Sequence, residues 1–192
     1  MHKLVTIGVK PLVKTPITPN QITTVRLITG VSAALFFAVG EDSFTTMGAG
    51  VFILSLLLDR ADGVLARLTG KMSISGHKYD LIADAVSNAL AFIGIGVGLR
   101  HSQLGDLAIP LGFVAGLAVT TVFFLVMNAE TRKGNRVAEL KSSAGFDLDD
   151  AMLLVPVAMM LDFCNELIIA AAFGASVFAI FFFFKFKHLL RP

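Results

Sequence analysis

The sequence is poor in charge, in cysteine and in two of the three large aromatic residues. Of its 192 residues, 16% are charged and 55% are hydrophobic; tryptophan is absent, Tyr79 is the one tyrosine and Cys164 the one cysteine. Soluble domains carry about 25% charged residues, so the low charge excludes an ordinary soluble domain and indicates a membrane protein. The single cysteine excludes an intramolecular disulfide. An aromatic belt at the membrane surface would depend on phenylalanine and Tyr79.

Apolar stretches separated by short polar ones predict an all-α, polytopic integral membrane protein of about six transmembrane helices. The first stretch is TPNQITTVRLITGVSAALFFAVG, in which Pro19 and Asn20 are helix-start residues. The other spans are expected at about residues 45–68, 78–99, 107–127, 151–161 with flanking residues, and 167–184. We therefore expect one membrane-embedded domain over residues 1–192, with no room for a soluble domain as well.

Residues 1–15, MHKLVTIGVKPLVKT, mix lysines with apolar residues. This mixture indicates a short amphipathic juxtamembrane segment that lies on the membrane surface. A frayed tail is the alternative.

The basic residues are distributed unevenly over the two sides of the membrane. Six spans place both termini on one side, and that side carries Lys3, Lys10, Lys14, Arg67, Lys71, Lys78, Arg132, Lys133, Arg136, Lys141, Lys185, Lys187 and Arg191. The other side carries Arg100 with Glu41, Asp42, Asp106, Asp162 and Glu166. The positive-inside rule therefore predicts cytoplasmic termini for a multi-pass protein of the cell (inner) membrane.

Four aspartates lie in otherwise apolar segments, within LLLDRADGVLARLTGKMSISGHKYDLIADAV at residues 56–86. Asp59 and Asp62 fall near the cytoplasmic end of the second span, and Asp80 and Asp84 near the cytoplasmic start of the third. Their i, i+3 and i, i+4 spacings place each pair on one helical face. The loop between the spans is short, so the helices are antiparallel neighbours and the four carboxylates should converge at similar depth.

Four carboxylates at one spot repel each other unless a cation neutralises them. Salt bridges to Arg60, Arg67 or Lys78 could supply part of that charge. Divalent cations would do so better, because carboxylate oxygens suit Mg²⁺, Mn²⁺ or Ca²⁺, and such sites often hold two ions. His77 is a possible ligand or an interfacial residue. Interhelical ion pairs without chemistry are the alternative, although ionisable groups inside a membrane are functional by default.

Small residues accompany the aspartates. Gly63 and Ala66 lie one turn apart and predict a groove, and Gly76 would let the backbone approach a phosphate. Arg67, one turn after Gly63, is placed to pair with a phosphate. These residues predict a site for a nucleotide and its phosphates.

The motif reads Asp59-x-x-Asp62-Gly63-x-x-Ala66-Arg67, then eight residues, then Gly76-x-x-x-Asp80-x-x-x-Asp84. This spacing resembles the signature of the CDP-alcohol phosphatidyltransferases, with every fixed position filled. The stretch PNQITTVRLITG resembles the usual first span of that family through Asn20, Thr23 and Arg26.

The resemblance implies a reaction in phospholipid biosynthesis. An acceptor hydroxyl attacks the β-phosphorus of a CDP-linked donor, usually CDP-diacylglycerol, and CMP leaves. It also implies residue roles, in which Asp59, Asp62, Asp80 and Asp84 hold metal ions, two Mg²⁺ or Mn²⁺, and Asp84 is the candidate general base. The nucleotide and its phosphates would lie against Gly63, Ala66, Arg67, Gly76, Thr23 and Arg26. Members are commonly homodimers.

The acceptor alcohol is less well indicated. Arg132, Lys133 and Arg136 could hold a phosphorylated acceptor, or could be basic residues beside lipid headgroups. Members that use inositol phosphate resemble G-x-x-x-R-x-E-R at the start of the fifth span, where this chain has GFDLDDAM. Because Asp147, Asp149 and Asp150 would repel a phosphate and would suit an acceptor with hydroxyls or an amine, we expect an acceptor that is not a phosphosugar; an acidic first helical turn is the alternative.

Other functions stay open from the residues alone. Glycerol 3-phosphate is a possible acceptor, and a minority variant uses a CDP-headgroup donor with a lipid acceptor. An ion-coupled transporter also keeps charges in its spans, but near the bilayer midplane. We expect no nucleic-acid partner.

Overall fold

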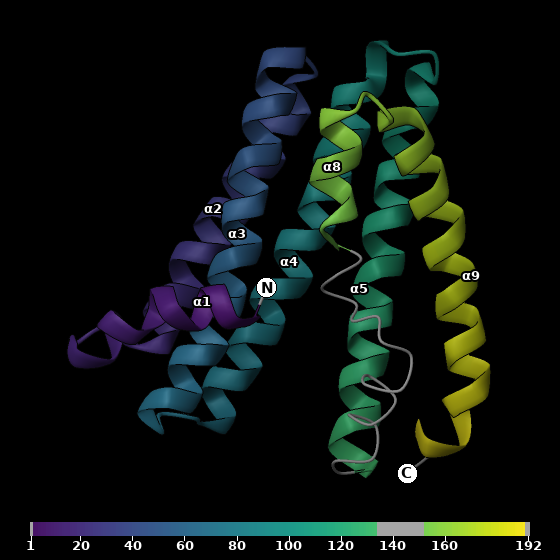
Figure 1. Cartoon of the computed structure of the whole chain (residues 1–192). Helices are drawn as coiled ribbons and strands as arrows, with labels where there is room; N and C mark the ends of the chain where they lie inside the picture. The colour runs from purple at the N-terminus through teal and green to yellow at the C-terminus, as the bar shows by residue number, and fades with distance from the viewer. Residues whose placement is uncertain (1, 134–151, 191–192) are drawn as a thin grey trace.

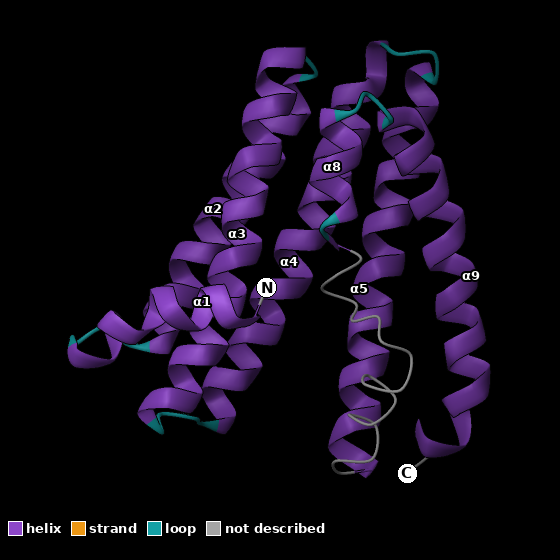
Figure 2. Ribbon diagram, viewed as in Figure 1, coloured by secondary structure: helices purple, strands orange, loops and turns teal. Residues whose placement is uncertain are grey.

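The structure is a computed structural model, and it describes residues 2–133 and 152–190 (Figure 1). The regular structure among these residues is helical throughout (Figure 2), as predicted. The elements are α1 (His2–Val9), η1 (Lys10–Lys14), α2 (Pro19–Val39), α3 (Asp42–Thr69), α4 (Ile74–Gly98), η2 (Leu99–His101), η3 (Gly105–Leu107), α5 (Ala108–Lys133), α8 (Leu154–Met160) and α9 (Cys164–Leu190).

The long helices run up and down beside one another. Helix α2 packs against both α3 and α4, α4 packs against α5, α5 against α9, and α3 against α8. Figure 1 shows the α3–α4 connection at the same end of the molecule as the C-terminal ends of α5 and α9. The α2–α3, α4–α5 and α8–α9 connections lie at the opposite end. We call the end of the molecule that holds the α3–α4 connection the α3–α4 end.

Local sequence signals fix the helix boundaries near the α3–α4 end. Thr18 begins α2 with a capping box, accepting from the backbone N–H of Gln21, whose side chain accepts from the backbone N–H of Thr18. Gly70 ends α3 with φ 67°, a left-handed conformation that favours glycine. Ser73 caps α4 by accepting from the N–H of Gly76. The short connection makes α3 and α4 run antiparallel, but the expectation that they pack as neighbours is not met, because α2 packs against both of them.

Four segments of the described residues are long and apolar enough to cross a membrane, at Pro19–Val39, Ile74–His101, Gly105–Leu125 and Cys164–Phe184. Helix α3 is not among them, although its 28 residues correspond to about 42 Å. Helix α8 has seven described residues. The chain is therefore a polytopic membrane protein, and the count of six spans stays a prediction.

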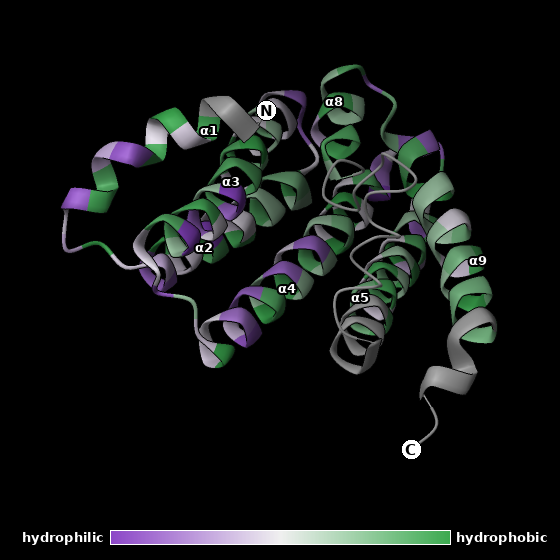
Figure 3. Cartoon of the chain, turned by 60° about the horizontal axis from the view of Figure 1, so that its bottom comes forward, coloured by the Kyte–Doolittle hydropathy of each residue, from purple (hydrophilic) through white to green (hydrophobic). Residues whose placement is uncertain are grey.

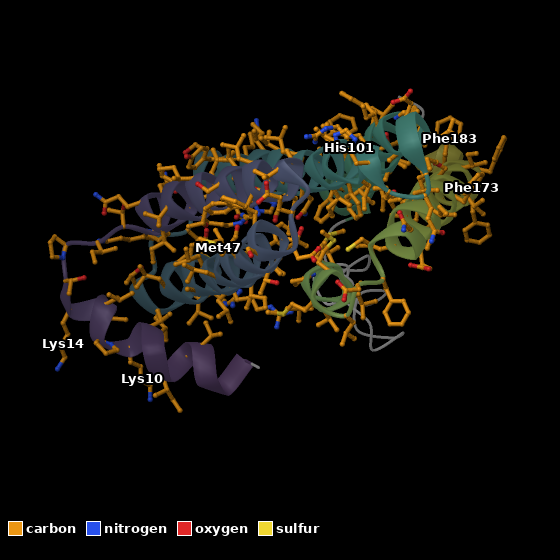
Figure 4. The ribbon with its side chains drawn as sticks, turned by 90° about the horizontal axis from the view of Figure 1, so that it is seen from above. Lys10, Lys14, Met47, His101, Phe173 and Phe183 are labelled. Atoms are coloured by element: carbon orange, nitrogen blue, oxygen red, sulfur yellow. The ribbon has the colours of Figure 1, made fainter. Side chains whose placement is uncertain are left out.

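Helix α9 presents phenylalanines to the outside of the bundle. Phe173 and Phe183 point away from the other helices in Figure 4, and they are 66% and 48% exposed. Phe181 and Phe184, in the predicted apolar run, are 58% and 61% exposed. Exposed aromatic surface of this extent suits contact with lipid.

The predicted N-terminal amphipathic segment is helical and lies across the bundle, with α1 packed on α3 (Figures 1 and 3). Val9 is buried in a cluster with Ile22, Val64 and Leu65. Lys10 and Lys14 point away from the bundle in Figure 4. The segment thus covers the α2–α3 pair with its apolar side and presents lysines outward.

Small residues let α2, α4 and α5 approach closely. A Cβ atom on Gly94 of α4 would lie 2.3 Å from the carbonyl oxygen of Ala34 on α2. Gly96 and Gly112 oppose each other in the same way between α4 and α5. In a membrane, helices associate through such close packing because lipid removes most of the hydrophobic driving force between them.

Candidate functional site

The aspartates of the motif come together near the α3–α4 end. Asp59 and Asp62 lie on α3, and Asp80 lies on the first turns of α4. Each of these three offers a carboxylate oxygen, and the three oxygens lie within 4.8 Å of one another. The convergence predicted from helical spacing is therefore present for this set, which we call the aspartate triad. Asp84 lies one turn beyond Asp80 on α4 and is outside the triad.

The four carboxylates differ in their exposure. Asp62 is buried, with 4% of the residue exposed. The side chains of Asp59 and Asp84 are 13% and 14% exposed, and that of Asp80 is 31% exposed. Charges at this depth need a partner, because an unpaired buried carboxylate is costly.

Arg26 of α2 contacts three of the four aspartates. Its Nη1 lies 3.0 Å from Asp59 Oδ1 and 2.9 Å from Asp80 Oδ1, and its Nη2 contacts Asp84 Oδ1. The sequence suggested Arg60, Arg67 or Lys78 for this task and placed Arg26 near the nucleotide. The guanidinium of Arg26 lies among the carboxylates, because α2 packs against both α3 and α4; its place near the nucleotide stays a prediction.

Asp62 is held by a hydroxyl. Thr23 of α2 donates a hydrogen bond of 2.6 Å to Asp62 Oδ2, and both residues are buried. The sequence placed Thr23 near the nucleotide phosphates, a role that stays a prediction. In the structure its contact is with an aspartate of the triad.

The sequence did not single out three further buried polar residues, Ser55 of α3 and Ser87 and Asn88 of α4. Ser55 donates to the carbonyl oxygen of Arg26 at 3.0 Å, and Ser87 and Asn88 are 2% and 3% exposed. A Cβ atom on Gly30 would meet Ser87 Oγ at 2.6 Å. The available signal was spacing, because Ser55 lies one turn before Asp59 and Ser87 one turn after Asp84 on the same helical faces.

The predicted nucleotide-binding residues fall on both sides of the α3–α4 connection. Arg67 is exposed, and its guanidinium nitrogens lie 3.8 and 4.0 Å from the position of a Cβ atom on Gly63. A Cβ atom on Gly76 would lie 3.0 Å from Asn20 Oδ1. Gly76 thus allows the start of α4 to approach α2. Its predicted role toward a phosphate stays a prediction, as do those of Gly63, Ala66 and Arg67.

The predicted acceptor residues are only partly covered by the structure. Arg132 and Lys133 belong to the C-terminal end of α5, which extends to Lys133. Arg136, Asp147, Asp149 and Asp150 lie outside the described residues. His77, weighed as a ligand, is exposed in the first turn of α4 and is not in the triad.

The triad has the chemistry of a divalent-cation site. It supplies three carboxylate oxygens from two helices, and hard oxygen ligands of this kind suit Mg²⁺ and Mn²⁺. The hydrogen bond from Thr23 fixes the orientation of Asp62, as outer-shell partners of metal ligands do. These residues fit a metal ion.

Fold and site together define a polytopic, all-α membrane protein with an acidic cluster, able to hold a divalent cation, near one end of its helices. The sequence pattern of the CDP-alcohol phosphatidyltransferase family matches residues 16–184. The chain belongs to this family, which confirms the resemblance seen in its motif. Because the family consists of transferases, the transporter alternative is not supported.

Two relatives add detail. The chain is 34% identical to the archaetidylinositol phosphate synthase of Pyrococcus horikoshii over 90 residues, 46% of each protein, so it matches about half the length of that relative. Its fold is similar to the crystal structure of phosphatidylinositol phosphate synthase from Mycobacterium tuberculosis with CDP-DAG bound, with a TM-score of 0.58. That likeness covers 90% of this chain and 96% of the other at 20% identity, and it shows the fold alone.

Proposed function

We propose that this protein transfers a phosphatidyl group from a CDP-alcohol, most simply CDP-diacylglycerol, to a hydroxyl of an acceptor alcohol and releases CMP. The observation that carries the proposal is the aspartate triad, formed by the motif residues of a chain that belongs to the CDP-alcohol phosphatidyltransferase family. The acceptor oxygen would form a bond to the β-phosphorus while the bond from that phosphorus to the CMP oxygen breaks. The product is a phosphodiester.

The residues near the triad take separate roles in this reaction. Asp59, Asp62 and Asp80 would hold the divalent cations, two Mg²⁺ or Mn²⁺, with Asp84 adjoining them. Bound cations neutralise the charge on a pyrophosphate and stabilise the leaving phosphate. Asp84 accepts the proton of the acceptor hydroxyl, as a carboxylate can when it lies within hydrogen-bond reach of that hydroxyl.

The donor would lie with its pyrophosphate at the α3–α4 end. Arg67 is exposed beside Gly63, where a guanidinium can pair with a phosphate. Gly63 and Ala66 would face the nucleotide, while Gly76 and Thr23 would border its phosphates. A site near the end of the helices leaves the lipid tails of the donor in the bilayer while the headgroup reacts at the surface.

The protein would be oriented with the α3–α4 end in the cytoplasm of the cell (inner) membrane, as a homodimer. Lys10, Lys14, Arg67 and Lys71 all belong to segments near this end and are exposed, which supports this orientation through the positive-inside rule. The homodimer rests on the family resemblance.

Two observations favour different acceptors. Asp147, Asp149 and Asp150 favour an acceptor that is not a phosphosugar, since they would repel its phosphate. The two relatives are named as synthases of inositol phosphate lipids, which favours inositol phosphate, held by Arg132, Lys133 and Arg136. We retain the acceptor favoured by the acidic residues as our proposal, because that argument starts from this chain and not from the names of relatives. Inositol phosphate becomes an arm of the test.

The test is CMP release by the purified full-length protein in lipid–detergent micelles. CDP-diacylglycerol and CDP-archaeol are supplied as donors, each with glycerol 3-phosphate, serine, inositol, inositol 1-phosphate, ethanolamine or choline. Metal-dependent CMP release with a new phosphodiester lipid, identified by mass, supports the reaction; its absence with every pair refutes it. Efficient turnover of inositol 1-phosphate would overturn the acceptor proposal and leave the reaction standing. A parallel arm with CDP-choline and diacylglycerol tests the reversed donor.

A further inference from the structure

Arg26 lies where one side chain can contact three of the four aspartates. Its Nη1 is 3.0 Å from Asp59 Oδ1 on α3 and 2.9 Å from Asp80 Oδ1 on α4, and its Nη2 contacts Asp84. The two nitrogens therefore have different partners. Nη1 contacts two members of the aspartate triad, whereas Nη2 contacts the carboxylate that lies outside it.

The position of Arg26 is built into the fold. Its side chain is 3% exposed. Its carbonyl oxygen accepts hydrogen bonds from Ser55 at 3.0 Å and from Thr29 at 2.8 Å. A buried guanidinium cannot lose its proton and needs acceptors around it, so the side chain and the carboxylates depend on each other.

A divalent cation in the triad would use the carboxylates that Nη1 contacts. A guanidinium and a metal ion would then compete for Asp59 and Asp80, and the two positive charges would repel each other at this separation. Asp84 contacts Nη2 and does not belong to the triad, so its contact with Arg26 does not compete with a metal ion held by the triad.

We propose that Arg26 is the built-in counter-cation of the metal-free site. Nη1 neutralises Asp59 and Asp80 and holds α3 and α4 at the correct separation until a metal ion takes those carboxylates. Nη2 retains Asp84 in both states, which keeps this carboxylate positioned beside the triad. Arg26 is thus a positioning residue, and the inference rests on the metal site of the proposed function.

The test compares metal binding and stability in variants of the full-length protein. Mn²⁺ binding is followed by the electron paramagnetic resonance signal of free Mn²⁺, and thermal unfolding by circular dichroism with EDTA and with saturating Mn²⁺. The variants are Arg26→Gln, which removes the charge, and Arg26→Lys, which keeps a charge but cannot contact all three carboxylates in the same way. The matched control is Arg100→Gln, because Arg100 is a part-buried arginine that donates to the carbonyl oxygens of Ala38 and Val97 and, within the part of the chain that the structure describes, forms no ion pair with a carboxylate.

We expect Arg26→Gln to lower the unfolding midpoint in EDTA much more than in Mn²⁺, and to bind Mn²⁺ about tenfold more tightly because a competing charge is gone. The unfolding midpoint in EDTA and the Mn²⁺ affinity of Arg26→Lys should both lie between those of the wild type and those of Arg26→Gln. Arg100→Gln should lower the midpoint equally in both conditions and leave Mn²⁺ affinity unchanged. If Arg26→Gln folds only with Mn²⁺, that result also supports the proposal.

Equal loss of stability in EDTA and Mn²⁺, with Mn²⁺ affinity unchanged or weaker, would overturn the role of Arg26. If Arg26→Gln does not fold in either condition, the stability of Arg26→Lys in EDTA and in Mn²⁺, together with its Mn²⁺ affinity, decides between the two outcomes. A wild-type protein that binds no Mn²⁺ would overturn the metal site itself, and so separates failure of the proposed function from failure of this inference.

Discussion

Asp84 differs from the other motif aspartates in its surroundings, and this difference suggests its separate role. It lies outside the triad and contacts Arg26 Nη2, which orients one of its oxygens. We expect Asp84→Asn to reduce metal-dependent CMP release by about 100- to 10,000-fold, the usual contribution of a general base. The carboxamide keeps the size of the side chain and can still accept from Arg26, so the helical circular dichroism signal should not change.

The control for this experiment is Asp106→Asn. Asp106 is an exposed acid in η3, at the end of the molecule opposite the α3–α4 connection. Its replacement should leave the rate unchanged. Normal turnover by Asp84→Asn would show that another group accepts the proton.

Replacement of Thr23 tests whether the hydroxyl beside Asp62 contributes to the affinity of the site for a divalent cation. We expect Thr23→Val to weaken Mn²⁺ binding by about tenfold, because loss of an outer-shell partner commonly costs 10- to 100-fold in metal affinity. Titration of free Mn²⁺ by electron paramagnetic resonance measures the change. Thr24→Val is the matched control, since Thr24 is exposed and bonds Tyr79 and the carbonyl oxygen of Asn20. Equal affinities in the two variants would contradict the role of Thr23.

The sequence predicts some of these contacts and not others, for a physical reason. Helical spacing within one segment pairs Asp59 with Asp62, and spacing within the next segment pairs Asp80 with Asp84. A short loop joins the two segments. Arg26 lies 54 and 58 residues before Asp80 and Asp84. Its contact with them depends on which face of α2 packs against α3 and α4, and periodicity does not determine that choice when all the helices are apolar.

Close approach between α2 and α4 depends on glycine, and it is separate from the chemistry of the site. We expect Gly94→Ala to destabilise the protein by about 1–3 kcal/mol, the usual cost of overpacking, because the new Cβ atom would lie 2.3 Å from the carbonyl oxygen of Ala34. Thermal unfolding in detergent, followed by circular dichroism, measures this. Gly50→Ala is the control: nothing lies within 4 Å of its Cβ position in α3, so stability should stay the same or increase by up to about 1 kcal/mol.

A Gly94→Ala variant as stable as Gly50→Ala would show that the α2–α4 pair can separate without cost.

The boundaries of the helices follow from local chemistry rather than from hydropathy. Helix α4 begins at Ile74, ahead of the predicted span at residue 78, because Ser73 caps it. Helix α5 continues to Lys133, beyond the apolar stretch, through Ala129, Glu130, Arg132 and Lys133. Such residues favour a helix in water, so the length of an apolar span underestimates the length of the helix.

The position of the site in the bundle sets a further requirement. Figure 1 shows α1 and the α3–α4 connection toward one end of the bundle, and the triad residues lie on the parts of α3 and α4 near that connection. Substrates that carry a cytidine nucleotide are polar and would have to reach that end from water. Our proposed orientation therefore places the α3–α4 end in the cytoplasm, where the positive-inside rule also places its lysines and arginines.

Labelling of single cysteines tests this orientation. Cys164 is the natural cysteine and is half-buried, so Cys164→Ser provides a background into which Lys71→Cys or Asp106→Cys is introduced. Lys71 is exposed in the α3–α4 connection, and Asp106 is exposed at the opposite end. We expect a membrane-impermeant maleimide to label Asp106→Cys on intact cells and Lys71→Cys only after permeabilisation, with no label in the background alone. Labelling of Lys71→Cys on intact cells, with Asp106→Cys protected, would place the triad outside the cell and refute the orientation.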